Sequence, residues 1–380
     1  MSDRELKSRK LDGADTKSAI RAFVRDLVEN GDIDAVLMPV RVPAGDSYAW
    51  ILMKDAEILD QASPMAPVMP VQGAKALKAL TRKGKGKMKV LALMRPCEIK
   101  AAIELTKLNQ VHLDNVVLAS YDCPGAIPLG DYSADPDGSE KIFDEILAGE
   151  ERVTSGVKRI CTVCIDFSFV DSDIHFGRYG TDGKTIAISR SDKGEALLGE
   201  PDADVSGWYV KAEELTAKAG EARKAAAVEI GAMVNGLEGM VKTFANCIAC
   251  HNCQSACPIC YCRQSYFDSE VATPEADSVY DKAVIRGGVS FPRDRMLFHT
   301  GRMAHMTLSC VSCGQCADVC PVFIPVASIF GYMADETQPV FEYRAGMNDG
   351  MPIPLRHFRE DEHPQVKELL KGAKEEMHHE

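Results

Sequence analysis

The sequence lacks the apolar segments that would direct a chain to or across a membrane. Residues 1–5 are polar and no apolar signal region follows them. No later apolar run is long enough to span a bilayer. We therefore expect a chain in reducing cytoplasm, where grouped cysteines bind metals or clusters instead of forming disulfides.

Positive charge and several enzyme signatures are also lacking. The 44 Lys and Arg against 56 Asp and Glu give a net charge of −12, which argues against nucleic acid as the partner. No pairing of histidines with carboxylates suggests hydrolysis or a nucleophilic triad. No G-x-G-x-x-G follows a strand, so a Rossmann nicotinamide site is not supported. No two cysteines are adjacent, which leaves out the Cys-Cys-Gly pattern of a disulfide-reducing cluster.

Cysteine, by contrast, is abundant, with 14 among the 380 residues. Eight of them form two runs with the same C-x2-C-x2-C-x3-C-P spacing, which is typical of [4Fe–4S] ligation. Three thiolates on one tight loop reach three corners of a cubic cluster, and a fourth closes a site. Zinc is the alternative, although its sites usually use separate Cys pairs, or Cys with His, at wider spacing. The predicted cluster ligands are Cys247, Cys250, Cys253, Cys257, Cys310, Cys313, Cys316 and Cys320.

Hydrophobic periodicity predicts an α/β (α+β) domain before these runs. Strands are expected at residues 35–42, 49–53, 90–94, 116–119 and 186–189, and helices at 16–27, 74–80, 98–108 and within 212–241. An inserted loop with a helix is expected at 133–151. Strand, helix and strand with short joints form a βαβ unit with parallel pairing. We expect three parts: residues 1–245, a ferredoxin-like two-cluster domain at 246–335, and a C-terminal extension at 336–380 lying over the body or a partner.

Four further cysteines are expected to meet in the first domain. Cys97 sits at a strand-to-helix turn, and Cys123 follows the next strand. Because the carboxyl ends of neighbouring parallel strands converge, these two should lie close together. With the C-x2-C pair of Cys161 and Cys164 they supply four thiolates, enough for a further [4Fe–4S] cluster. The alternative is two small buried hydrophobes and a redox-active pair.

Cys260 and Cys262 complete the set. Either could replace Cys257 as a ligand, or both could be protective or structural thiols.

Two stretches resemble a known family. Residues 91–128, with Arg-Pro-Cys-Glu-Ile-Lys and Ser-Tyr-Asp-Cys-Pro-Gly, are similar to the coenzyme F420 hydrogenase/dehydrogenase beta-subunit family, and so are residues 161–177. The resemblance covers most of residues 16–245. With the fused ferredoxin-like part, the chain looks most like beta subunits of F420-dependent formate dehydrogenases.

This resemblance implies an oxidoreductase subunit that holds FAD and iron–sulfur clusters. Such proteins pass electrons between the deazaflavin F420, a catalytic subunit of formate dehydrogenase or hydrogenase type, and sometimes a heterodisulfide-reductase complex. Cys97, Cys123, Cys161 and Cys164 would hold the proximal cluster. The flavin would be approached by loops that contain Arg95, Asp166, Gly177 and Gly180. Met94-Arg95-Pro96-Cys97 stands where some members carry a glycine-rich Gly-Thr-Pro-Cys-type turn, which leaves room for a two-electron donor other than F420.

Several polar features have two interpretations. Gly177, Gly180 and Gly183 either allow close approach to a flavin phosphate or are turn glycines. The basic run 82–89 either meets an anionic cofactor or is a solvated loop. The cations before the second cysteine run either tune a cluster and dock a partner or form surface ion pairs. These cations are Arg286, Arg293, Arg295, His299, Arg302 and His305.

Three functions follow from these features. The favoured one is a subunit in which FAD exchanges a hydride with a two-electron carrier and the clusters carry single electrons to a partner. The second is a flavin-free relay of clusters between two proteins. The third is a structural or regulatory cluster protein.

Overall fold

The computed structural model describes residues 6–153, 155–262, 265–272, 274–289, 291, 295–347 and 350–357. Arg293 and the last part of the predicted C-terminal extension, residues 358–380, lie outside the described residues. Within the described part, no helix combines the length and the apolar character that crossing a bilayer requires.

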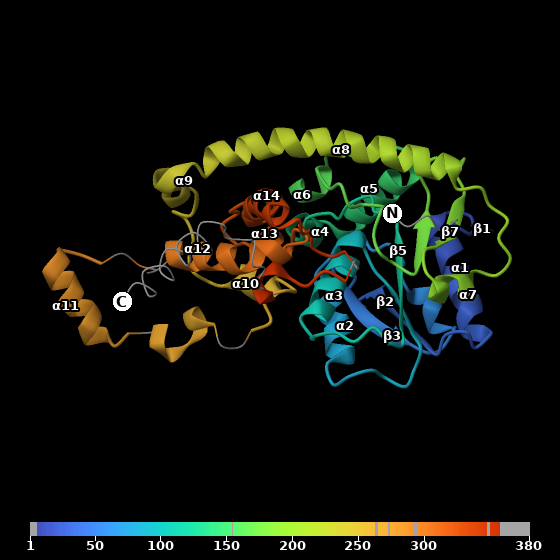
Figure 1. Ribbon diagram of the computed structural model, residues 1–380, viewed down its shortest axis with the longest axis horizontal. Helices are drawn as coiled ribbons and strands as arrows, with labels where there is room; N and C mark the ends of the chain where they lie inside the picture. The colour runs from blue at the N-terminus through green and yellow to red at the C-terminus, as the bar shows by residue number, and fades with distance from the viewer. Residues whose placement is uncertain are drawn as a thin grey trace, which may run out of the picture.

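A seven-stranded mixed sheet forms the first half of the chain (Figure 1), in the order β1-β7-β6-β5-β4-β2-β3. The four central strands run parallel, and β3, β7 and β1 are antiparallel additions at the two edges. The strands are β1 (Ser8–Leu11), β2 (Ala35–Arg41), β3 (Tyr48–Met53), β4 (Val90–Leu93), β5 (Val116–Tyr121), β6 (Ile174–Gly177) and β7 (Thr185–Ser189). The parallel centre brings the carboxyl ends of β4, β5 and β6 to one edge.

Helices cover both faces of this sheet because successive residues of a buried parallel strand point to opposite sides. Leu91 and Val117 pack in the core that contains α1 (Thr16–Glu29). Their neighbours Ala92 and Leu118 pack in the core formed with α2 (Gly73–Thr81) and α3 (Pro96–Lys107). The remaining helices of this half are α4 (Leu129–Ala134), α5 (Pro136–Ala148), α6 (Arg159–Thr162) and α7 (Asp192–Leu198).

The second half is helical and joins the first through one long helix. α8 (Ser206–Met233) has 28 residues and runs from the sheet to the helical half, where α9 follows (Figure 1). At 1.5 Å per residue it is about 42 Å long. The other helices are α9 (Gly236–Thr243), α10 (Asn252–Ala256), α11 (Ala276–Arg286), α12 (Arg295–Met306), α13 (Gln315–Asp318) and α14 (Val326–Thr337).

The predicted fold class is confirmed, since a mixed α/β domain precedes the segment with the two cysteine runs. The predicted helix at 16–27 is α1, and the Asp15 side chain caps its first turn. The helix expected within 133–151 is confirmed as α5, which starts at Pro136 after Asp135, and α4 precedes it. The predicted boundaries at 245 and 335 remain predictions.

Candidate metal centres

The two cysteine runs share a local backbone geometry that suits cluster binding. In each run the residues on either side of the second cysteine have positive φ: Ala249 and His251 beside Cys250, and Ser312 and Gly314 beside Cys313. Non-glycine residues rarely adopt this conformation, so three of these four positions are strained. The backbone N–H of Ala249 donates to Cys247 Sγ at 3.4 Å. Such a loop directs its N–H groups toward sulfur, as a bound anionic cluster requires.

The structure divides the eight cysteines crosswise between the runs. Cys257, the last cysteine of the first run, lines one pocket with Cys310, Cys313 and Cys316 of the second run. Cys320, the last of the second run, is close enough to Cys253 to affect its pKa, as are Cys247 and Cys250. This exchange of the fourth cysteine is the arrangement of two-cluster ferredoxins.

We name the two groups by their members. The outer set is Cys247, Cys250, Cys253 and Cys320, and the middle set is Cys310, Cys313, Cys316 and Cys257.

The four cysteines of the first domain also meet, and we call them the proximal set: Cys97, Cys123, Cys161 and Cys164. All four line one pocket. Cys97 lies in the first turn of α3, directly after β4, and Cys123 follows β5. Cys313 of the middle set lines the same pocket, so the proximal and middle sets are neighbours.

Burial favours the neutral form of two thiols of the proximal set when no metal is bound. Burial raises the pKa of Cys161 to about 11, and Cys123 adds to this effect. Burial likewise raises the pKa of Cys97, with contributions from Glu98 and Cys313. A coordinated metal reverses such shifts because it deprotonates the thiol. Among the described residues, no three Cys, His, Asp or Glu side chains gather closely enough to bind one metal ion. A four-iron cluster differs because it takes each thiolate on a separate iron.

Charged side chains brace the loops that carry the proximal set. Arg152 Nη1 donates to the carbonyl of Cys164 at 3.0 Å, and its guanidinium lies 4.1 Å from the Phe167 ring centroid. Lys158 Nζ forms a buried ion pair with Asp318 Oδ2 at 2.6 Å. Since Asp318 lies in α13, between Cys316 and Cys320, this pair ties the two halves together beside the cysteine sets.

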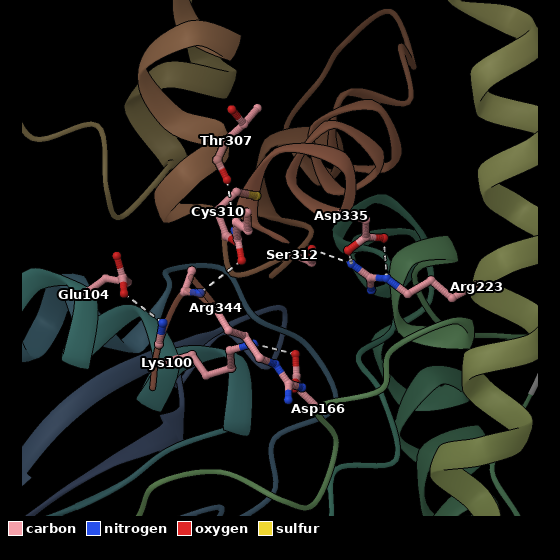
Figure 2. A network of polar contacts seen from close by, with 12 residues as sticks. Lys100, Glu104, Asp166, Arg223, Thr307, Cys310, Ser312, Asp335 and Arg344 are labelled. Atoms are coloured by element: carbon pink, nitrogen blue, oxygen red, sulfur yellow. Dashed lines mark hydrogen bonds and ion pairs between the residues drawn. The ribbon is translucent and has the colours of Figure 1, made fainter. Parts of the chain in front are cut away.

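A second polar network surrounds the same junction (Figure 2). Lys100 and Arg344 both pair with Asp166, and Arg223 of α8 forms a bidentate pair with Asp335 at 2.6 and 2.8 Å. Arg223 Nη2 also donates to Ser312 Oγ at 3.1 Å. Burial would raise the pKa of Asp166, but Lys100 and Arg344 lower it, so this carboxylate is charged.

The four residues expected to approach a flavin are engaged by the protein itself. The buried Arg95 guanidinium donates to the carbonyls of Ala66 and Gly125. Asp166 is held in the ion pairs above. A Cβ on Gly177 would come within 2.8 Å of the Trp208 ring, and one on Gly180 within 2.6 Å of the Gly207 carbonyl, so both glycines allow close packing of α8. Flavin contact by these residues remains a prediction that their surroundings do not favour.

The structure also places the basic run 82–89 and the cations that precede the second cysteine run. The cations of the basic run 82–89 are mostly exposed and precede the amino end of β4, whereas Cys97 follows its carboxyl end. The run is therefore a loop remote from the cysteines. Of the cations before the second run, His299 and Arg302 are buried beside the outer set, while Arg286 is exposed.

Sequence reasoning missed Arg152, Lys158 and Asp318 as supports for the loops that carry the cysteines. Lys158 and Asp318 lie within three residues of a predicted cysteine ligand, and this proximity was the only signal that could have found them, whereas Arg152 stands nine positions before Cys161.

Comparisons with known proteins agree with these sites. A family model described as a 4Fe-4S dicluster domain matches residues 243–324, which include both cysteine runs. The F420-dependent formate dehydrogenase subunit beta of Methanocaldococcus jannaschii is 25% identical over 378 residues, covering 89% of this chain and 94% of the relative. The F420-dependent formate dehydrogenase 1 subunit beta of Methanococcus maripaludis is 26% identical over 392 residues, covering 91% and 94%.

Among solved structures, a chain of the F420-reducing [NiFe] hydrogenase complex from Methanosarcina barkeri matches with 14% identity and a TM-score of 0.44. The match covers 61% of this chain and 93% of that one.

The predicted resemblance is confirmed: the chain is similar, over about nine tenths of its length, to beta subunits of oxidoreductases. The predicted iron–sulfur character is confirmed by the dicluster match.

Proposed function

We propose that the chain is the electron-transfer subunit of an oxidoreductase complex and holds three [4Fe–4S] clusters in a row. This proposal rests on one observation: neighbouring cysteine sets are in contact through shared pockets and shared runs. Cys313 of the middle set lines the pocket of the proximal set. Cys257 also belongs to the middle set, but it comes from the first run, which supplies three cysteines of the outer set. Electrons therefore have a continuous path through the proximal, middle and outer clusters.

The protein's own residues bury and orient these clusters, while the clusters supply one-electron chemistry. Cys97, Cys161 and Cys313 are half-buried, and burial raises the pKa values of their thiols. Burial and nearby charge set cluster potentials, so Lys158, Arg152 and Arg223 hold the relay in a defined electrostatic environment. The Lys158–Asp318 pair fixes the proximal set against the middle set.

The two relatives support an F420-type partner at the proximal end. Both are called F420-dependent formate dehydrogenase subunits. A deazaflavin such as F420 carries two electrons as a hydride, whereas a cluster accepts one, so a converter is needed. We propose FAD as this converter and a catalytic subunit of formate dehydrogenase, hydrogenase or heterodisulfide-reductase type as the other partner. Arg95, Asp166, Gly177 and Gly180 are engaged by the protein itself and do not offer a flavin open contacts.

A flavin-free relay is the second candidate function, and one observation favours it. The guanidinium of Arg95 and the surfaces of Gly177 and Gly180, which were expected to face a flavin, are occupied by carbonyls and by α8. In that case a partner subunit would carry the two-electron chemistry.

Iron and flavin content of anaerobically purified protein tests the proposal. Three clusters require about 12 irons and about as many acid-labile sulfides per chain. Flavin is released with acid and measured by fluorescence. About 12 irons with one FAD supports the hydride-converting subunit, and the same iron without flavin supports the relay. About 8 irons in protein whose thiols are fully reduced would overturn the three-cluster path.

A further inference from the structure

The helix α12 presents two buried side chains to the outer set. His299 and Arg302 are three residues apart, so they lie on one face of the helix. Arg302 Nη1 donates to Cys253 Sγ at 3.1 Å, and Nη2 lies 3.3 Å from the carbonyl oxygen of the same residue. His299 Nε2 lies 3.3 Å from Cys247 Sγ. Two of the four outer thiols therefore each have a nitrogen at hydrogen-bonding distance.

Aromatic rings hold both side chains in position. His299 is 1% exposed and stacks on Phe244 with ring centroids 3.9 Å apart. Arg302 is 6% exposed, and its guanidinium lies 4.8 Å from the Phe330 ring centroid. Neither side chain can turn to solvent without breaking this packing, so their contacts with sulfur are built into the fold.

The charge of Arg302 is balanced by sulfur. No Asp or Glu of the described part of the chain forms an ion pair with it. A buried cation without a counter-charge is costly. A four-iron cluster with four thiolate ligands is an anion, and it gains one more negative charge on reduction.

We propose that Arg302, assisted by His299, raises the reduction potential of the cluster held by the outer set; this rests on the proposed three-cluster function. A fixed cation stabilises the reduced, more negative state more than the oxidised state. Hydrogen bonds to ligand sulfur act in the same direction. The two residues are positioning residues that act on potential, and the cysteines remain the ligands.

The same side chain reaches toward the middle set. Arg302 Nη2 lies 3.9 Å from Cys260 Sγ, and the Cys260 thiol hydrogen-bonds to Cys257. Cys260 therefore links the Arg302 guanidinium to Cys257, a member of the middle set. The effect of Arg302 should be largest on the outer cluster, smaller on the middle one and absent from the proximal one.

An anaerobic redox titration of the full chain, followed by electron paramagnetic resonance, tests this proposal. Arg302→Met removes the charge at similar volume, and Arg302→Lys keeps the charge but loses the forked donor. His299→Gln keeps a donor of different geometry. Arg286→Met, at an exposed position of α11, is the control for loss of one positive charge. The signal of the outer cluster is identified by its disappearance in Cys320→Ala.

We expect the outer midpoint potential to fall in Arg302→Met and to fall less in Arg302→Lys and His299→Gln. The proximal potential should stay unchanged, as should all potentials in Arg286→Met. Unchanged outer potentials in variants that retain wild-type iron would overturn the proposal. If Arg302→Met loses the outer cluster, the midpoint potentials of Arg302→Lys and His299→Gln test the proposal in its place. Failure of the three-cluster function would be visible separately, as low iron in the wild-type chain.

Discussion

At the scale of single residues, Asp122 organises the end of β5 that carries Cys123. Its buried carboxylate accepts hydrogen bonds from Ser168 Oγ, from Trp208 Nε1 at 3.0 Å and from the N–H of Arg178 at 2.7 Å, and it contacts His175 Nε2 at 2.9 Å. Burial would raise the pKa of Asp122, but the bonds from His175 and Ser168 lower it. One carboxylate thus joins β5, β6 and α8 next to Cys123.

Asp122→Asn should therefore destabilise the folded chain. The amide can accept fewer of these bonds and turns an N–H group toward buried donors. Hydrogen bonds to a charged group are each worth about 1.5–3 kcal/mol, so we expect a loss of about 2–3 kcal/mol. The measurement is the apparent melting temperature, at one fixed scan rate, by circular dichroism.

The matched control is Asp182→Asn. Asp182 is exposed and has a φ of 53°, a conformation that asparagine tolerates well. It should melt like the wild type. Equal melting temperatures for Asp122→Asn and Asp182→Asn would mean that the buried network does not stabilise the fold.

The role of Asp122 was not predictable from its own neighbourhood. The residue stands within Ser-Tyr-Asp-Cys-Pro-Gly, where the sequence drew attention to Cys123 alone. Its partners Ser168, His175 and Trp208 lie 46, 53 and 86 positions away. Local spacing carries no information about such contacts, whereas C-x2-C spacing describes one loop and can be recognised directly.

At the scale of elements, the crossed cysteine sets make a prediction about iron loss. Cys253→Ala and Cys320→Ala each remove a ligand of the outer set, so the double variant should lose the same single cluster, about four irons. Cys316→Ala with Cys320→Ala removes ligands of two different sets, although both residues belong to one run. That double variant should lose about eight irons.

Iron and sulfide analysis of the singles and doubles measures this pattern. Ligation within each run would reverse it: the Cys316 and Cys320 pair would then lose one cluster, and the Cys253 and Cys320 pair two. Cys257 is avoided in this design because Cys260 hydrogen-bonds to it and could take its place.

A second element, the segment after α14, depends on one glycine. The N–H of Gly346 donates to Glu104 Oε1 of α3 at 2.8 Å, and Tyr343 OH donates to the same oxygen at 2.5 Å. Gly346 has a φ of 81°, and a Cβ there would come within 2.3 Å of Lys100 Cβ. Gly346→Ala should therefore detach this segment from α3 and disturb the Lys100–Asp166–Arg344 network.

Limited proteolysis and hydrogen exchange of residues 338–347 measure this detachment. Gly350→Ala is the control, since Gly350 has a similar φ of 76° but nothing within 4 Å of an added Cβ. Both variants incur the conformational cost of a positive φ, and only Gly346→Ala adds a clash. Equal protection of the segment in the two variants would contradict the prediction.

The elements themselves were only partly predictable. The apolar pattern found α1, which buries one face, and it found β4 and β5, which are continuous apolar runs that are buried throughout. It missed β1, whose four residues pair with β7 about 180 positions later, and β6, which lies in a segment that looked like a loop. It could not reveal the exchange of Cys257 and Cys320, since spacing within a run is the same with or without the exchange.

At the scale of the whole molecule, the three cysteine sets lie in sequence from the sheet domain into the helical half. The proximal set stands at the carboxyl edge of the parallel strands, and the outer set lies under α12. α8 spans the same two halves (Figure 1). Its Arg223 donates a hydrogen bond to Ser312, the residue before Cys313 of the middle set (Figure 2). A relay in this order makes the proximal set the sole cluster link between the sheet domain and the other two sets.

Removing the proximal set should therefore isolate the other clusters from the two-electron donor. Cys161→Ala with Cys164→Ala should lose about four of about 12 irons and leave the middle and outer signals intact. The donor that reduces the wild-type chain, with reduced F420 tested first, should then reduce those two clusters at least tenfold more slowly. Dithionite should reduce them as before, because it reaches them without the relay. Undiminished reduction by the physiological donor would mean that electrons enter the helical half directly, and the proximal set would then be a side branch of the path.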